Sequence, residues 1–142
     1  MTAFVPQILY TEDDADTREL VSYVLTTSNC KVTLADSDAK ALLLAETIKF
    51  DLYLIDNWLR EGSGIELCKK LRELDPGTPI LFYSGAAFDK DKHEAFASGA
   101  QAYLIKPVDN DELVKEVFRL ISEARNGNPR EKTSVDLAQF GT

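Results

Sequence analysis

Asp51-Leu52-Tyr53-Leu54-Ile55-Asp56 is the segment that decides the fold class of this chain. Its four apolar residues are too few for a helix, and their branched and aromatic side chains favour a strand that is buried on both faces. Asp56 follows that strand directly. In open parallel α/β sheets, ligands bind just outside the carboxyl ends of the strands. An acid at this position is therefore either a cap of the strand end or a reactive group.

Four further apolar runs alternate with helical patterns along the chain. The five strands are expected at residues 5–10, 30–34, 52–55, 80–83 and 102–105. The apolar faces of the helices are expected to hold Leu20, Val21, Val24 and Leu25; Ala41, Leu42, Ala45 and Ile48; Leu67, Cys68, Leu71 and Leu74; and Leu113, Val117, Phe118 and Ile121. This alternation predicts an α/β fold with a five-stranded parallel sheet. Right-handed crossovers and the chain length favour the flavodoxin-like, doubly wound order 2-1-3-4-5, with helices on both faces.

Capping residues mark the ends of several expected helices. Asp36 or Ser37 can cap the second helix, and Ser63-Gly64-Ile65-Glu66 has the Ser-x-x-Glu form of a capping box at the start of the third. The short fourth helix is expected over about residues 89–98, because Gly99 is a natural residue to end it.

Composition limits the classes of protein that fit. Of the 142 residues, 44% are hydrophobic, which is enough for one domain with a proper core. We assign residues 1–126 to that domain and residues 127–142 to a flexible tail or linker. The net charge of -8 works against direct binding of nucleic acid, and no apolar run suits a membrane span or a signal peptide. Cys30 and Cys68 lack metal or redox spacing, so we expect two buried or half-buried thiols in the cytoplasm.

Polar side chains follow four of the expected strands. Glu12 and Asp13 come after the first strand, Asp56 after the third, Ser84 after the fourth and Lys106 after the fifth. The carboxyl ends of parallel strands lie along one edge, and the order 2-1-3-4-5 places these four strands side by side. We therefore expect three carboxylates, a hydroxyl and an ammonium group in one crevice.

This set of groups suits phosphoryl chemistry around a divalent ion. Three carboxylates in one place repel one another unless a cation lies among them, and oxygen ligands alone favour Mg²⁺. Asp56 can then attack phosphorus as a nucleophile, while Lys106 and Ser84 bind the phosphoryl oxygens. Positioning and charge neutralisation are most of what phosphoryl transfer requires of a protein.

Over about residues 7–124 the sequence resembles a response regulator receiver domain, the phospho-accepting half of two-component signalling. Each matching residue is weak evidence alone, but the order and spacing together are highly specific. The resemblance rests on Glu12, Asp13, Asp56, Gly64, Ser84, Tyr103, Lys106 and Pro107.

The resemblance implies that a histidine kinase or a phosphotransfer protein donates a phosphoryl group to Asp56 in a Mg²⁺-dependent reaction. The implied metal ligands are Glu12, Asp13, Asp56 and the backbone carbonyl of Trp58. The resemblance also implies a cis peptide bond at Lys106–Pro107, which X-Pro bonds adopt at modest cost.

The resemblance implies a switch as well. On phosphorylation, Ser84 would move toward the phosphoryl oxygens and Tyr103 would turn inward. This would change the face built from the fourth helix, the fifth strand and the fifth helix, where a downstream protein target or a second copy of the chain would bind. Such a domain is not an enzyme, although it assists its own phosphorylation and dephosphorylation.

The sequence departs from the receiver pattern mainly in the segment after Asp56. Arg60 stands where receivers often have proline, which leaves that loop less stiff. Trp58 either hinders a water molecule that attacks the phosphoryl group or simply covers the loop, and both roles are open. His93 is expected on the surface without a catalytic role, and Asp14 at the start of the first helix.

Three other classes of protein are alternatives to a phospho-accepting receiver. A phosphatase of the haloacid-dehalogenase type needs a second aspartate two residues after the nucleophile, where this chain has Trp58. A flavin-binding module needs a hydroxyl- and glycine-rich phosphate loop after the first strand, where Glu12 and Asp13 would repel phosphate. A receiver-like docking module that is never phosphorylated is the remaining alternative.

Overall fold

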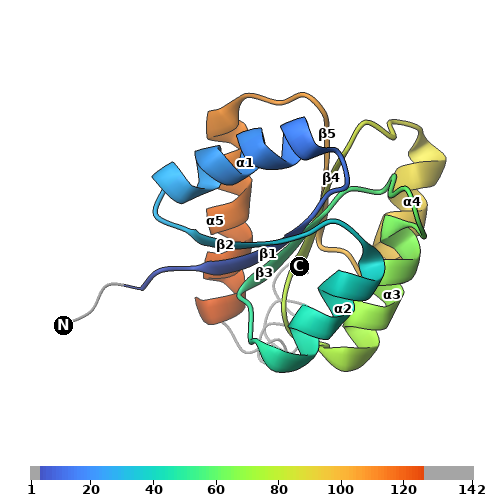
Figure 1. Ribbon diagram of the computed structural model, residues 1–142, viewed down its shortest axis with the longest axis horizontal. Helices are drawn as coiled ribbons and strands as arrows, with labels where there is room; N and C mark the ends of the chain where they lie inside the picture. The colour runs from blue at the N-terminus through green and yellow to red at the C-terminus, as the bar shows by residue number, and fades with distance from the viewer. Residues whose placement is uncertain (1–3, 127–142) are drawn as a thin grey trace, which may run out of the picture.

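Five parallel strands form one sheet through the centre of the molecule (Figure 1). The computed structural model describes residues 4–126, so the predicted tail, residues 127–142, lies outside the described residues. The predicted fold class and strand order are confirmed, because the sheet has the order β2-β1-β3-β4-β5. The strands are β1 (Gln7–Thr11), β2 (Lys31–Ala35), β3 (Leu52–Ile55), β4 (Ile80–Ser84) and β5 (Ala102–Ile105).

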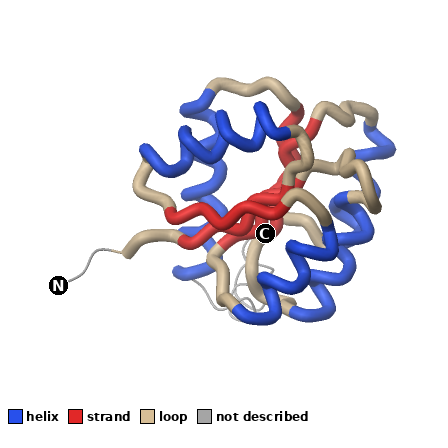
Figure 2. Tube along the Cα trace, viewed as in Figure 1, coloured by secondary structure: helices blue, strands red, loops and turns tan. Residues whose placement is uncertain are grey.

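Five helices cover the two faces of the sheet. Helices α1 and α5 lie on one face, and α2, α3 and α4 lie on the other (Figure 2). Each helix connects or follows strands that run in the same direction, as a doubly wound fold requires. Their bounds are α1 (Ala15–Thr27), α2 (Asp38–Thr47), α3 (Gly64–Leu74), α4 (Asp89–Ser98) and α5 (Asn110–Asn126).

Strand β3 is buried over its whole length because both of its faces meet helices. Leu52 and Leu54 belong to the core cluster beneath α1 and α5. Tyr53 and Ile55 belong to the cluster beneath α2, α3 and α4. Successive side chains of a strand point to opposite faces, so an uninterrupted apolar run is what a central strand needs.

The predicted N-cap positions of α2 and α3 are confirmed. Ser37 and Ser63 are the N-caps of α2 and α3, and each hydroxyl oxygen accepts a hydrogen bond from the amide three residues later. Asp14 caps α1 in the same way. Gly99 ends α4 in the left-handed conformation, with φ of 119°.

Three strands differ in their bounds from the prediction, and β4 is the simplest case because it extends by one residue to Ser84. β1 begins at Gln7 instead of residue 5 and extends to Thr11, and Val5 is exposed. β2 is likewise displaced by one residue, from 30–34 to 31–35. For β1 and β2, hydrogen bonding with the neighbouring strand sets the bounds, and β1 pairs with β2 from Gln7 through Thr11.

Several predicted core positions were wrong. Leu20 is 60% exposed because it lies about 100° around α1 from Val21, which faces the sheet. Leu74 is exposed in the last turn of α3. In α5, Leu120 is buried with the predicted Leu113, Val117 and Ile121, although it was not predicted, while Phe118 is only partly buried against the cluster.

The remaining expectations about the chain concern cysteine and membranes. Cys30 and Cys68 are both buried and neither forms a disulfide, as predicted. His93 is exposed on α4. Within residues 4–126, no helix combines the length and the apolar character needed to cross a bilayer.

We predict that Asp75 makes the stability of this fold depend on acidic pH. Partial burial opposes ionisation of Asp75, but hydrogen bonds from Thr78, Tyr53 and the Gly77 amide outweigh it and hold the pKa of Asp75 below its ordinary value. A carboxylate with a lowered pKa stabilises the fold above the ordinary pKa of 3.8, and this contribution is lost as the pH falls below it.

Asp75→Asn should therefore cost about 1–3 kcal/mol of unfolding free energy at pH 7 and less at pH 3. Urea unfolding of both proteins at several pH values measures this difference. The same cost at pH 3 and pH 7 would contradict the prediction.

Candidate functional site

Backbone hydrogen bonds fix the chain just beyond the strand ends at one edge of the sheet. The amide of Asp56 donates to the carbonyl of Thr11 at 3.1 Å, and the amide of Lys106 donates to the carbonyl of Ser84 at 2.9 Å. The amide of Glu12 donates to Ala35 at 3.0 Å. The first residues after β1, β3 and β5 are therefore each held by a backbone hydrogen bond to a neighbouring strand.

Lys106 joins two buried carboxylates at this edge. Its Nζ lies 2.6 Å from Oε1 of Glu12 and 3.3 Å from Oδ2 of Asp56. Glu12 and Asp56 are only 1% and 5% exposed. Burial alone would lower the pKa of Lys106, but these two acids outweigh it and raise that pKa above its ordinary value.

Glu12 is the most enclosed acid of the site. Burial raises the pKa of Glu12 to about 7, and Asp56 adds to the rise while Lys106 opposes it. The Tyr10 hydroxyl donates to Oε1 of Glu12 at 3.2 Å, and the Asp14 amide donates to Oε2 at 3.3 Å. A carboxylate in this position depends on its donors, because water cannot replace them.

Asp13 lies at the same edge of the sheet, but its carboxylate contacts the β3–α3 loop and not Lys106. It accepts a hydrogen bond from the backbone amide of Arg60 in the β3–α3 loop. Oδ1 of Asp56 accepts a hydrogen bond from the backbone amide of Trp58 at 3.2 Å. Within the described part of the chain, no three His, Cys, Asp or Glu side chains are gathered closely enough to hold a metal ion.

Ser84 and Tyr103 are connected through one residue of the β4–α4 loop. The amide of Ala86 donates to Oγ of Ser84 at 3.2 Å, and the Tyr103 hydroxyl donates to the carbonyl of Ala86 at 2.6 Å. The ring of Tyr103 stacks on Phe82 with centroids 5.5 Å apart. Burial raises the pKa of Tyr103, while hydrogen bonding with Asn57 and Ser84 opposes the rise. The β4–α4 loop is thus held at Ala86 by both Ser84 and Tyr103.

Two backbone features complete the site. The Lys106–Pro107 peptide bond is cis, as the resemblance implies. Gly64 packs against the segment that carries Asp56, and a Cβ at Gly64 would lie 2.5 Å from the Asp56 carbonyl oxygen and 2.8 Å from Cα of Asn57. Only a glycine allows α3 to start this close to the strand end.

Comparison with known families agrees with this arrangement. The family model described as response regulator receiver domain matches residues 8–118, most of the chain. The chain belongs to the response regulator receiver domain family. This family works in the two-component systems that the sequence resemblance indicates.

Known relatives of this receiver domain include longer proteins. It is 29% identical over 119 residues to the cell cycle transcriptional regulator CtrA of Caulobacter vibrioides, covering 84% of this chain and 52% of CtrA. It is 33% identical over 134 residues to the transcriptional regulatory protein ZraR of Salmonella typhimurium, covering 94% of this chain and 30% of ZraR. The chain therefore spans about half of the first relative and less than a third of the second.

Other relatives have a length similar to this receiver domain. An uncharacterized 14.6 kDa protein of Leptolyngbya boryana is 37% identical over 112 residues, which cover 78% of this chain and 86% of that protein. A CheY-like receiver domain protein from Methanospirillum hungatei has a TM-score of 0.83 at 26% identity, covering 87% of this chain and 98% of that one. Chemotaxis protein CheY4 of Vibrio cholerae has a TM-score of 0.79 at 28% identity, with coverage of 82% and 99%.

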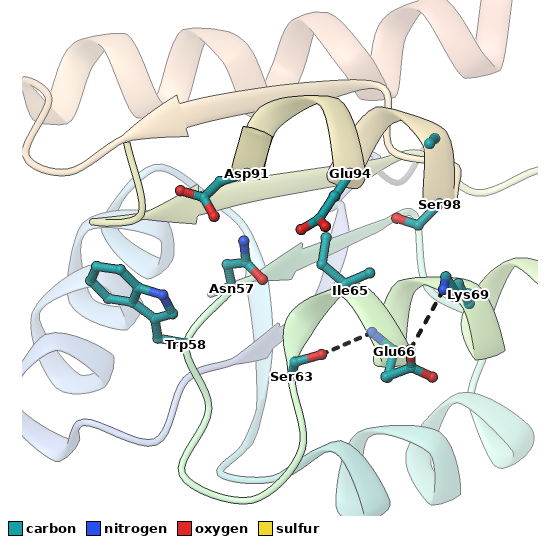
Figure 3. Close-up of a pocket in the computed structure, with 10 residues that line it drawn as sticks. Asn57, Trp58, Ser63, Ile65, Glu66, Lys69, Asp91, Glu94 and Ser98 are labelled. Atoms are coloured by element: carbon teal, nitrogen blue, oxygen red, sulfur yellow. Dashed lines mark hydrogen bonds and ion pairs between the residues drawn. The ribbon is translucent and has the colours of Figure 1, made fainter. Parts of the chain in front are cut away.

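A groove of about 470 Å³ lies between α3 and α4 beside the receiver site. Asp91 and Glu94 of α4 line one wall and Ile65 of α3 lies opposite, with Trp58 at one end (Figure 3). The Trp58 indole is 61% exposed, and a Cβ at Gly85 would lie 3.3 Å from its Cζ3 atom. The indole therefore leans from the β3–α3 loop toward the loop that follows Ser84.

Sequence reasoning missed three contacts of the receiver site. Tyr10 precedes Glu12 by two residues, a spacing that places both side chains on one face of an extended chain, so this contact had a usable signal. The connection of Ser84 with Tyr103 through Ala86 gave no sequence signal, because it uses the backbone amide and carbonyl of Ala86. The Arg60 amide that engages Asp13 belongs to an irregular loop and likewise left no pattern.

We predict that Gly64→Ala destabilises the receiver domain. A methyl group at Gly64 would overlap the backbone beneath it, which must move. Overpacking of this kind costs about 1–3 kcal/mol. Gly77→Ala is the matched control, since a Cβ there meets no atom within 4 Å, and it should change stability by less than about 0.5 kcal/mol. Equal unfolding free energies for the two variants would contradict this account.

Proposed function

We propose that this receiver domain accepts a phosphoryl group on Asp56 and thereby switches a protein-binding face. The observation that carries the proposal is the contact of Lys106 with both Asp56 and Glu12. An ammonium group beside a nearly buried carboxylate lowers the repulsion that an anionic phosphodonor would meet. The same ammonium can bind the transferred group.

The oxygen donors at this edge fit Mg²⁺ by their chemistry. Asp13, Asp56, Glu12 and the Trp58 carbonyl offer only oxygens, which a hard ion of this kind prefers. Mg²⁺ would neutralise carboxylate charge and share a phosphoryl oxygen of the donor. Asp13 would turn from the Arg60 amide to take part, which requires a rotation of its side chain in the exposed loop region.

The transfer itself is a displacement at phosphorus. A carboxylate oxygen of Asp56 forms the new P–O bond while the P–N bond of a phosphohistidine breaks, and the histidine keeps the electron pair of that bond and takes up a proton. The product is an aspartyl phosphate. The ammonium group of Lys106 moves to bind the transferred phosphoryl group, and the Ser84 hydroxyl donates a hydrogen bond to one of the phosphoryl oxygens.

The connection through Ala86 supports the switch. When Ser84 turns toward the phosphoryl group, its oxygen leaves the Ala86 amide, and the carbonyl of the same residue is the acceptor of Tyr103. Release of the loop therefore changes the position of Tyr103 in β5. The affected face consists of α4, β5 and α5, where a downstream protein or a second copy of this chain would bind.

The proposed donor is a histidine kinase or a histidine phosphotransfer protein in the cytoplasm. The named relatives CtrA and ZraR are regulators of which this chain matches only part. Its output is therefore proposed to pass through a protein contact, with no direct contact to nucleic acid by this domain.

We predict that Asp56 is the only residue phosphorylated by small donors. Incubation with acetyl phosphate and Mg²⁺, followed by intact-mass measurement, should show a gain of one phosphoryl group in the wild type and none in Asp56→Asn. Asp13→Asn, which keeps Asp56, should gain it more slowly. A wild type that gains no mass would favour the docking module that is never phosphorylated.

We predict that Trp58 prolongs the life of the phosphorylated form. The indole extends from the loop after Asp56 toward Gly85 and so covers one approach for water. Trp58→Asn should lose the phosphoryl group several-fold faster, and Trp58→Phe should be intermediate. Decay measured by intact mass decides this, and unchanged or slower loss in Trp58→Asn would contradict it.

A further inference from the structure

Tyr10 brings a buried phenolic hydroxyl into contact with the candidate site. The side chain is fully buried in β1, and its hydroxyl donates to Oε1 of Glu12 at 3.2 Å. The same oxygen accepts from Nζ of Lys106 at 2.6 Å. One carboxylate oxygen is therefore shared by a neutral donor and a charged donor, while Oε2 faces the amide of Asp14.

The core fixes the position of this hydroxyl. The Tyr10 ring belongs to the cluster beneath α1 and α5, together with residues of β3 and α5 such as Leu54 and Val117. Burial raises the pKa of Tyr10, and the neighbouring Glu12 adds to the rise, so the phenol stays protonated as a donor. Unlike Lys106, which is a flexible side chain, the ring cannot follow a moving ligand.

We propose that Tyr10 is a positioning residue of the phosphoacceptor site, whose hydroxyl holds Oε1 of Glu12 when Lys106 leaves it for the phosphoryl group. This inference rests on the proposed function, because it supposes that Lys106 moves. A buried carboxylate that loses a charged donor is costly to leave unpaired. The Tyr10 hydroxyl keeps Oε1 paired, while Oε2 still accepts from the Asp14 amide, so Glu12 holds its position at the edge where the metal ion is proposed to bind.

Tyr10→Phe removes only this hydroxyl. Glu12 would then depend on Lys106 alone for a side-chain donor to Oε1, so Lys106 would be released less readily. We expect the Mg²⁺ concentration for half-maximal binding to rise about threefold to tenfold, the size expected for the net contribution of one ordinary hydrogen bond. The phosphorylation rate at saturating Mg²⁺ should fall by a similar factor.

Tyr53→Phe is a matched control within the same sheet. Tyr53 is also buried, and its hydroxyl also donates to a carboxylate, that of Asp75, at 2.9 Å. That contact lies in the α3–β4 turn, away from the strand ends that carry Asp56. Both substitutions remove one oxygen and one hydrogen bond to a carboxylate, so a purely structural role predicts the same kind of outcome for both.

The experiment compares wild type, Tyr10→Phe and Tyr53→Phe by three measurements. Unfolding in urea gives the stability, Mg²⁺ titration of the fluorescence of Trp58 (the single tryptophan) gives binding without a phosphodonor, and intact mass with acetyl phosphate gives the rate. Weaker Mg²⁺ binding and slower phosphorylation in Tyr10→Phe alone, at similar stability loss in both variants, would support the proposal. Equal Mg²⁺ binding and equal rates in the two variants would overturn it. A wild type that gains no phosphoryl group would instead refute the proposed function, and this inference with it.

Discussion

The contact of one ammonium group with two buried carboxylates is the constraint on which the rest of the site depends. Glu12 and Asp56 are taken out of water by the ends of β1 and β3, and two such acids side by side repel each other strongly. Lys106 offsets that repulsion from the end of β5. A buried pair of this kind is weak evidence for stability, because desolvation of its charges opposes it. It is stronger evidence for a site whose charge balance changes when a ligand arrives.

The fold provides this arrangement through strand order. β1, β3, β4 and β5 are neighbours in the sheet although long stretches of sequence separate them. Their buried side chains alternate between two core clusters, so the register of each strand is fixed over its whole length. Because the register is fixed, the residue that follows each strand is fixed too. The chemistry at the edge is thus a consequence of core packing.

Much of this could be predicted from the sequence because the signals are local. The apolar run of β3, the serine caps of α2 and α3, and Gly99 at the end of α4 each follow from neighbouring residues. The prediction that Leu20 is buried was wrong, because the sequence does not show whether an apolar residue at the border of a helical stripe faces the core or the solvent. Asp13 could be placed at the correct edge, but its hydrogen bond to the Arg60 amide depends on an irregular loop that no periodicity describes.

A crystal structure with Mg²⁺ and beryllium trifluoride, a mimic of the phosphoryl group, tests the central claim most directly. The account predicts the beryllium bonded to a carboxylate oxygen of Asp56, with Nζ of Lys106 moved from Glu12 to a fluorine atom. It also predicts the ion among Glu12, Asp13, Asp56 and the Trp58 carbonyl. Beryllium on another carboxylate, or Lys106 still bound to Glu12 beside a modified Asp56, would contradict it.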